Sequence, residues 1–332
     1  VNVGDSVDIT GATISVSGGG TYDVNLTGTS ASSTMTSAQL KAANSFTETS
    51  GGAKQVTVTG ALTGTTIDST IDTLVLADAT NSVTLGAAGQ NVTGGSGADT
   101  VTMITGATGT INVAGGTNVV NVGDNIDISG ATLSKSGTLA LNLSGSATSS
   151  VTVAAAHLKT GVNSITEASG GAKTVTVVGA LTGYTINTTI DTLALANATN
   201  SVTLGATAQN VTGNAGADTV TMIDSASGTI ALGDGANVVK IGDSVDISGA
   251  TLSKSGGGSV DINLSGSATS SVTVAAAHLT TANTMTEASG GAKTVTAVGA
   301  LSGYTLHTAV DTLVLANATN SVTLGATAQN VT

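Results

Sequence analysis

The chain of 332 residues repeats itself nearly three times, and this repetition limits its fold more than any other feature. The pentapeptide SGGAK ends at Lys54, Lys173 and Lys293, so its copies lie 119 (173 − 54) and 120 (293 − 173) residues apart. Longer phrases, such as DTLVLADATNSVTLG, recur with the same spacing. Tandem copies of this kind are typical of arrays in which each repeat covers the apolar face of its neighbour.

The spacing divides the chain into repeat 1 (1–119), repeat 2 (120–238) and an incomplete repeat 3 (239–332). The pattern starts and stops in the middle of a phrase, whereas natural arrays usually end in atypical, polar capping repeats. We therefore expect both termini to be cut points in a longer array.

Each repeat consists of short runs in which apolar residues alternate with Thr, Ser or Asn, as in KTVTVV at 173–178. Alternation with a period of two indicates β-strands with one buried face. Gly, Asn, Asp and Ser separate the runs and favour turns. Strands recur about every 8–12 residues, which suits either a sandwich or a solenoid.

Composition decides between these two folds. The chain has three Tyr, one Phe and no Trp, Pro or Cys. Tandem β-sandwich domains, the alternative, usually rest on a buried aromatic core. We predict an all-β chain folded as a parallel β-solenoid, a rod of roughly 80 Å with about 20 residues and ~4.8 Å per coil. Val175 and Val177 should point inward, and Thr174 and Thr176 outward.

One segment of each repeat interrupts the alternation. The Ala- and Leu-rich stretches at 36–44, 154–163 and 275–283 are expected to form one or two helical turns on one flank of the solenoid. Helices this short are not stable alone, so packing against the strands must hold them.

A nonapeptide with a known metal chemistry occurs in repeat 1. GGSGADTVT (94–102) has the form G-G-x-G-x-D-x-U-x, with U apolar, which is typical of calcium-binding parallel β-rolls. GNAGADTVT (213–221) is its counterpart in repeat 2. Ca²⁺ takes ~6–8 oxygen ligands, and turn carbonyls with an Asp carboxylate supply them. We therefore expect calcium at Asp99 and Asp218, with simple capping of their own turns as the alternative.

Three further aspartates are candidate calcium ligands. Asp124 and Asp243 begin equivalent D-x-x-D pairs, and Asp234 occurs only in repeat 2. Residues three apart in a strand face opposite ways, so a D-x-x-D pair converges only where the chain turns between the two carboxylates. If calcium binds, its removal should loosen the Gly-rich segments 86–124 and 205–243 first.

The nonapeptides resemble the repeats-in-toxin family over about 40 residues per repeat, although most neighbouring Asp slots have lost their charge. Longer phrases, IDTLVLADATNSVTLG and SVTVAAAHLKTGVNSITEASG, resemble β-strand repeats of bacterial surface-layer proteins and giant surface adhesins. The resemblance implies secretion through a C-terminal signal, assembly outside the cell and frequent use of calcium.

Charge and hydropathy exclude two classes of partner. Eight basic residues, all Lys, stand against 20 acidic ones and give a net charge of −12. Nucleic acids and anionic membranes attract positive surfaces, so neither is an expected partner. No apolar run approaches the ~20 residues of a membrane-spanning helix, so no membrane insertion is expected.

No catalytic constellation is visible in the sequence. His157 and His278 occupy the same position in successive repeats, where repeat 1 has Gln39. A catalytic residue would not be exchanged for Gln in this way, so we expect these histidines on the surface of the helical flank. The periodic carboxylates fit a solvated face. We predict that the chain is not an enzyme.

Three functions remain. The first is a structural protein at the bacterial cell surface that assembles with itself, end to end or side by side, into a surface layer, sheath or filament. The second is the stalk or binding region of a large adhesin. The third and weaker one is an ice-binding solenoid. The expected partner is the chain itself, with cell-surface polysaccharide as an additional candidate and calcium as the candidate cofactor.

Overall fold

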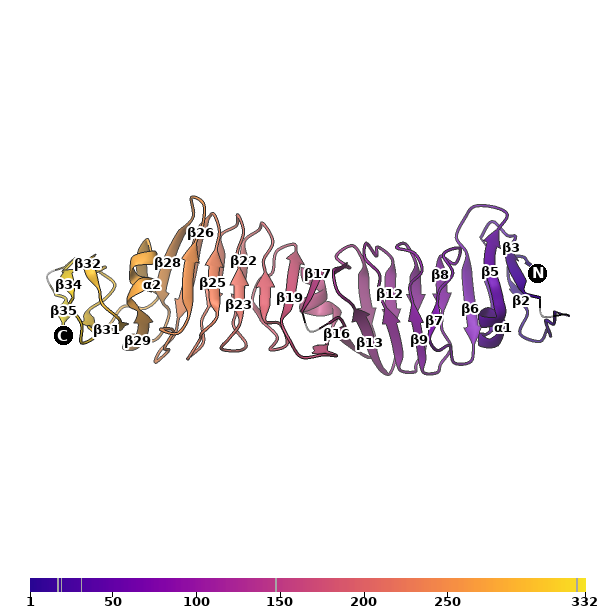
Figure 1. Ribbon diagram of the computed structural model, residues 1–332, viewed down its shortest axis with the longest axis horizontal. Helices are drawn as coiled ribbons and strands as arrows, with labels where there is room; N and C mark the ends of the chain where they lie inside the picture. The colour runs from indigo at the N-terminus through magenta and orange to yellow at the C-terminus, as the bar shows by residue number, and fades with distance from the viewer. Residues whose placement is uncertain (17, 19, 31, 147, 327) are drawn as a thin grey trace. The chain divides into compact units, whose positions relative to one another are not determined.

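The computed structural model describes residues 1–16, 18, 20–30, 32–146, 148–326 and 328–332. It is all-β, and its strands stack in parallel as the coils of a β-solenoid (Figure 1). Every strand pair found among the described residues is parallel, so the predicted parallel β-solenoid is confirmed and the sandwich alternative is wrong. Two compact units, Val1–Gly171 and Ala172–Thr332, are described separately below.

In the N-terminal unit, successive coils contribute strands to three parallel sheets. Their strands are, in order along each sheet, β1 (Asn2–Val3), β3 (Tyr22–Leu26) and β5 (Ala43–Glu48); then β2 (Val7–Asp8), β4 (Ser32–Thr36), β6 (Gln55–Thr59), β8 (Thr73–Val75), β10 (Asn91–Thr93), β12 (Thr110–Val113) and β15 (Thr132–Lys135); then β7 (Thr65–Thr66), β9 (Asn81–Thr84), β11 (Asp99–Thr102), β13 (Thr117–Val122), β16 (Thr138–Leu143) and β18 (Ser164–Glu167). In addition, β14 (Ile126–Asp127) pairs with β17 (Ser149–Ala154).

The C-terminal unit repeats this arrangement. Its strands are, in order, β19 (Lys173–Val178), β21 (Thr192–Ala194), β23 (Asn210–Thr212), β25 (Thr229–Leu232) and β27 (Thr251–Lys254); β20 (Tyr184–Thr185), β22 (Asn200–Thr203), β24 (Asp218–Thr221), β26 (Ala236–Ile241), β28 (Ser259–Leu264) and β30 (Thr284–Glu287); β29 (Ser270–Ala275), β31 (Lys293–Val298), β33 (Thr312–Val314) and β35 (Asn330–Val331); and β32 (Ser302–Thr305) with β34 (Ser321–Thr323).

The parallel register pairs aliphatic residues with aliphatic residues in successive coils. Val56 pairs with Leu74 and Leu74 with Val92, so a coil takes 18 residues here (74 − 56 and 92 − 74). In the C-terminal unit Val175 pairs with Leu193, and both are buried, whereas the neighbouring Thr side chains face outward. The predicted inward and outward positions are therefore confirmed, and the core is a thin ladder of aliphatic side chains.

Short helices lie on the flank, as predicted. They are α1 (Ser37–Ala42), the π-helical turn η2 (His157–Gly161) and α2 (Ala276–Thr281). Thr36 caps α1, and its hydroxyl accepts a hydrogen bond from the backbone N–H of Gln39 at 3.1 Å. Among the described residues, no helix has the length and hydropathy needed to cross a membrane.

Candidate functional site: carboxylates at the coil corners

Asp99 and Asp218, the aspartates of the two nonapeptides, lie at the start of β11 and β24 and face the core. Both side chains are 0% exposed. Each pairs in register with an asparagine in the preceding coil, Asn81 for Asp99 and Asn200 for Asp218. The strand pattern explains the position, because an inward residue two before the buried Val of the nonapeptide must also face inward.

Each aspartate lies between two asparagines in a column of three buried side chains. The columns are Asn81–Asp99–Asn118 in the N-terminal unit and Asn200–Asp218–Asn237 in the C-terminal unit. We call these the amide columns. Asn81 Nδ2 donates to Asp99 Oδ1 at 2.7 Å, and the backbone N–H of Asp99 donates to Asn118 Oδ1 at 2.9 Å. The second column has the same two bonds, at 2.8 and 3.0 Å.

The side chain of the first asparagine in the column makes more hydrogen bonds than the side chain of the aspartate. Asn81 Nδ2 also donates to the carbonyls of Ala77 and Ala79, four and two residues earlier, at 3.0 and 2.8 Å. Within the described part of the chain, Asp99 Oδ2 and Asp218 Oδ2 are buried and have no hydrogen-bond partner. Desolvation raises the pKa of both carboxyl groups above the ordinary 3.8.

The surroundings of Asp99 Oδ2 fit a proton better than a calcium ion. Oδ2 lies so close to Gly94 that a Cβ added there would stand 2.3 Å from it. Ca²⁺ needs several more oxygens than one carboxylate offers. Among the described residues there is no group of three or more His, Cys, Asp or Glu that could hold a metal. Calcium at Asp99 and Asp218 stays a prediction, and it requires the turn carbonyls to move toward the carboxylate.

The other three candidate ligands, Asp124, Asp243 and Asp234, are exposed and clamp the next coil. Both carboxylate oxygens of Asp124 accept the backbone N–H of Ser146 at 3.0 Å, and Asp243 does the same to Ser267 at 2.9 Å. Asp234 accepts the backbone N–H of Gly257 at 2.6 Å.

A glycine next to each clamped residue allows the close approach. An added Cβ at Gly145 or Gly266 would stand 1.9 or 1.8 Å from the carboxylate. The hydrogen bond from Ser267 lowers the pKa of Asp243. The second aspartate of each D-x-x-D pair binds elsewhere: Asp127 and Asp246 accept the N–H two residues on, at 2.8 Å each. The clamps therefore join neighbouring coils by hydrogen bonds, and calcium at these three aspartates stays a prediction.

Three lysines that sequence reasoning passed over are the most unusual buried groups. Lys54, Lys173 and Lys293, the last residues of the SGGAK copies, are each 0% exposed. Lys54 Nζ donates to the carbonyls of Ser50 at 2.7 Å and Gly52 at 3.0 Å, and lies 3.3 Å from Glu48 Oε2. Lys293 Nζ donates to the carbonyl of Ser267. The recurrence of SGGAK in all three repeats is the sequence signal that could have indicated a structural role for these lysines.

The repeated histidines are buried, so the expectation of a surface position was wrong. His157 is 2% exposed; its Nδ1 accepts the N–H of Ala154 at 3.2 Å, and its Nε2 donates to the carbonyl of Ala131 at 2.9 Å. His278 makes the same pair of bonds. In repeat 1 the amide of Gln39 makes equivalent bonds. Its Oε1 accepts a hydrogen bond from the backbone N–H of Thr36 at 2.8 Å, and its Nε2 donates to two carbonyls. The Gln-to-His exchange between repeats therefore conserves hydrogen bonding.

Replacing both histidines with the residue of repeat 1 (His157→Gln with His278→Gln) is expected to reduce acid sensitivity. Burial lowers the histidine pKa from 6.5, so the stability that they contribute is present above pH 6.5 and lost as pH falls through the lowered folded value. Gln does not titrate. Urea unfolding should give equal stability at pH 8 and an advantage of about 1 kcal/mol for the variant in acid. Identical acid sensitivity of the two proteins would contradict this.

Comparison with known proteins adds no relative: no family model, curated protein or solved structure matches the chain.

Proposed function

We propose that the chain is a structural protein of the bacterial cell surface, whose solenoid associates side by side with copies of itself outside the cell. The observation that supports this most is an outward row of short polar side chains in each unit, interrupted by Lys240 in the C-terminal unit. Side-chain hydrogen bonds join Asn121 to Asn142, Asn142 to Thr166, and Asn263 to Thr286 along it. Such a row offers the same contact many times, and multivalent contact makes weak individual interactions effective.

The row, called here the Thr/Asn row, follows the parallel register of the sheet from β7 to β18 in the N-terminal unit and of the sheet from β20 to β30 in the C-terminal unit. In the N-terminal unit it consists of Thr66, Thr84, Thr102, Asn121, Asn142 and Thr166. In the C-terminal unit it consists of Thr185, Thr203, Thr221, Lys240, Asn263 and Thr286. Rungs stand ~4.8 Å apart. Short side chains lose little rotamer entropy when a neighbour orders them, which favours lateral contact.

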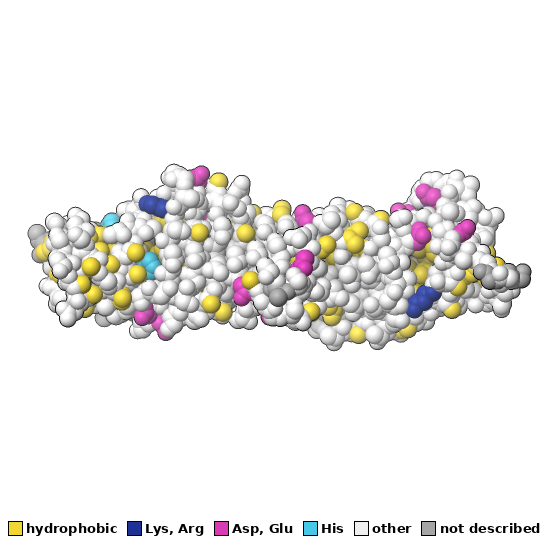
Figure 2. All heavy atoms as spheres, in the orientation of Figure 1, with side chains coloured by type: hydrophobic (Ala, Val, Ile, Leu, Met, Phe, Trp, Pro, Cys, Tyr) yellow, Lys and Arg dark blue, Asp and Glu magenta, His cyan; other side chains and the backbone are white. Residues whose placement is uncertain are grey.

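The surface charge sets the conditions for association. In the face drawn in Figure 2, charged side chains are few and scattered, and most of the surface belongs to backbone and uncharged polar side chains. The net charge of −12 still opposes the approach of two copies. Salt should therefore promote association by screening, and a divalent cation should act at lower concentration if it bridges carboxylates such as Asp124 and Asp234.

Two other functions remain. An adhesin stalk uses the same solenoid without self-association, so monomers under all conditions would favour it. Ice binding needs a continuous double row of threonines. The row beside the Thr/Asn row reads Ser82, Thr100, Val119, Ala140 and Ser164 in the N-terminal unit, so T-x-T occurs at only one of these rungs. This interruption makes ice binding the weaker alternative.

The test is sedimentation velocity and negative-stain electron microscopy at rising protein, NaCl and CaCl₂ concentrations, with MgCl₂ and a chelator as comparisons. We expect ordered side-by-side assemblies at high protein concentration, promoted by salt. Thr102→Glu with Thr221→Glu should raise the concentration needed at least about tenfold, because the added charges repel across the row. Thr102→Gln with Thr221→Gln is the uncharged control. Particles that stay monomeric throughout would reject the proposal in favour of the stalk.

A further inference from the structure

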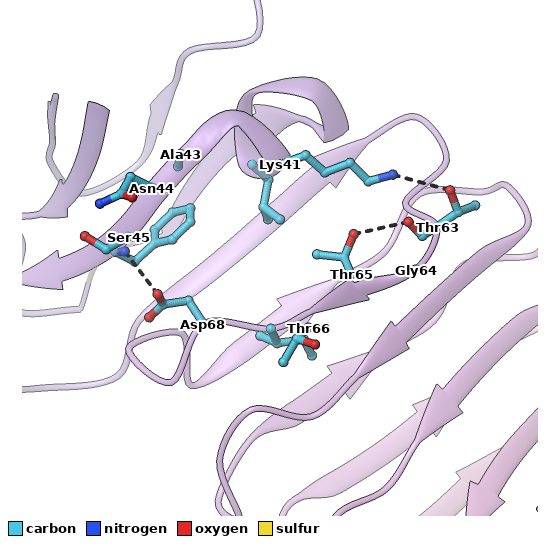
Figure 3. A pocket seen from close by; sticks show the side chains of 12 residues that line it. Lys41, Ala43, Asn44, Ser45, Thr63, Gly64, Thr65, Thr66 and Asp68 are labelled. Atoms are coloured by element: carbon cyan, nitrogen blue, oxygen red, sulfur yellow. Dashed lines mark hydrogen bonds between the residues drawn. The ribbon is translucent and has the colours of Figure 1, made fainter. Parts of the chain in front are cut away.

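A groove of about 570 Å³ opens on the N-terminal unit beside α1 (Figure 3). It lies where the sheet β1–β3–β5 stops and the sheet that begins at β7 has not paired with it. Its apolar lining is Leu40, Phe46 and Ile67, and its polar rim includes Lys41, Asn44 and Asp68. In Figure 3, Lys41 lies on one side of the groove, and Asn44 and Asp68 lie on the other.

Repeat 3 fills the corresponding gap with a side chain of its own. Thr65 of β7 corresponds to Tyr304 of β32 by the offset that relates Lys54 to Lys293 (304 − 65 = 293 − 54). Tyr304 is 8% exposed, its hydroxyl lies 3.7 Å from Met285 Sδ, and its ring lies edge-on to His307 at 6.1 Å. Burial raises the pKa of Tyr304 to about 12. A gap of this construction thus accepts a six-membered ring with a polar edge.

Repeat 1 lacks that ring and has other hydrogen-bonding groups at the rim. Where repeat 3 has Tyr304, His307 and Thr280, repeat 1 has Thr65, Asp68 and Lys41 by the same offset. The smaller Thr leaves the ring's place open. The exchanged rim residues carry a carboxylate and an ammonium group of opposite sign, so the groove has no strong net charge.

The rim is held in position before any ligand arrives. Asp23 Oδ1 accepts from Asn44 Nδ2 at 3.0 Å and from Ser45 Oγ at 2.7 Å. Asp68 Oδ2 accepts the backbone N–H of Phe46 at 3.1 Å, and Lys41 Nζ donates to Thr63 Oγ1 at 3.3 Å. Groups fixed in this way lose little conformational entropy on binding, so weak ligands can be recognised.

We propose that this groove binds one neutral pyranose ring of a polysaccharide. The apolar lining, in which Leu40, Phe46 and Ile67 are 6%, 6% and 2% exposed, offers a small contact to the C–H groups of a sugar. The carboxylate, amide, ammonium and hydroxyl groups of the rim suit its hydroxyls. The Lys41 ammonium group and the Asp68 carboxylate have hydrogen-bonding capacity beyond the bonds given above. An aromatic side chain of a partner protein would remove water from these groups without replacing its hydrogen bonds, which costs free energy. The net charge of −12 disfavours a polyanionic glycan. The site does not depend on self-assembly.

The experiment uses the full chain with methyl pyranosides of glucose, galactose, mannose and N-acetylglucosamine, and with N-acetyltyrosinamide as the aromatic competitor. Saturation-transfer NMR and amide shifts report binding, with an expected Kd near ~1 mM. Thr65→Tyr, which copies repeat 3, should weaken pyranoside binding at least tenfold. Asp68→Asn should weaken it severalfold. Asn keeps the bond from the N–H two residues on, as Asn187 of repeat 2 shows, at 2.9 Å each, but gives up the bond from Phe46 N–H, so Thr65→Tyr is the deciding variant.

The control is Thr110→Tyr, an exposed threonine of β12 in a different sheet, which should bind pyranosides like the parent chain. Pyranoside binding that moves the amides of Phe46 and Asn44 and falls in both groove variants supports the proposal. Three results would overturn it: no pyranoside binding at ~50 mM, binding that Thr65→Tyr leaves unchanged, or binding of N-acetyltyrosinamide alone.

Discussion

Leu193→Asp is expected to unfold the coils around β21 and to leave distant coils folded. Leu193 is 0% exposed and stands in an aliphatic ladder between Val175 and Val211. A carboxylate there has no partner, so the local cost should exceed about 4 kcal/mol. Coils contact mainly their neighbours, and stability in such arrays is close to a sum of local terms, so the damage should fade along the chain.

Hydrogen exchange read by mass spectrometry, segment by segment, checks this expectation. Protection should be lost in β19, β21 and β23 and kept in strands of repeat 1. Thr192→Asp is the matched control, because it places the same charge next door on the outward face and should change stability by less than about 0.5 kcal/mol. Loss of protection in all three repeats together would show that the chain folds as one cooperative unit.

Asp99→Asn and Asp218→Asn are expected to raise stability at neutral pH by about 1–3 kcal/mol per site, because an orphaned buried acceptor becomes a donor. The new Nδ2 can donate to the carbonyls of its own turn, as Asn81 does to Ala77 and Ala79. The retained Oδ1 still accepts from the asparagine of the preceding coil. The substitution converts each amide column into a run of three asparagines.

The pH dependence of this gain has a defined sign. The folded pKa of Asp99 is raised above 3.8, so the stability that Asp99 contributes is fully present below pH 3.8 and is lost as pH rises through the folded value. The advantage of Asp99→Asn should therefore be small at pH 3.5 and largest at pH 7. Guanidinium unfolding at both pH values, in a chelator, measures it.

Calcium turns the same variants into a test of the nonapeptide hypothesis. If Asp99 and Asp218 bind calcium after a shift of their turns, millimolar calcium should stabilise the parent chain and not the asparagine variants. Asp124→Asn, which alters an exposed clamp, is the control and should keep any response that arises at the nonapeptides. A parent chain that calcium leaves unchanged, with asparagine variants that are more stable at neutral pH with or without calcium, would reject the nonapeptide hypothesis and leave these residues as structural members of the amide columns.

The alternating pattern was enough to predict the strands and the inward valines, and the composition was needed to predict the parallel coils. Strand side chains alternate at every residue, so the face of Val175 follows from its neighbours in sequence. The absence of large aromatic side chains pointed to a thin core, and the Ala- and Leu-rich stretches marked the helical flank. All of these depend on contacts within a few residues or on the repeat itself.

The roles of individual polar residues depended on the tertiary structure. The partner of Asp99 is Asn81, one coil and 18 residues away, and the partner of Asp124 is Ser146, 22 residues away. Coil length varies with each turn, so the sequence does not indicate which side chains are stacked until the register is known. Burial of Lys54 and His157 follows from corner geometry, where a polar residue turns inward to bind carbonyls of its own loop or of the preceding coil. Local periodicity assigns a face to each residue, and only the stacking of coils assigns it a partner.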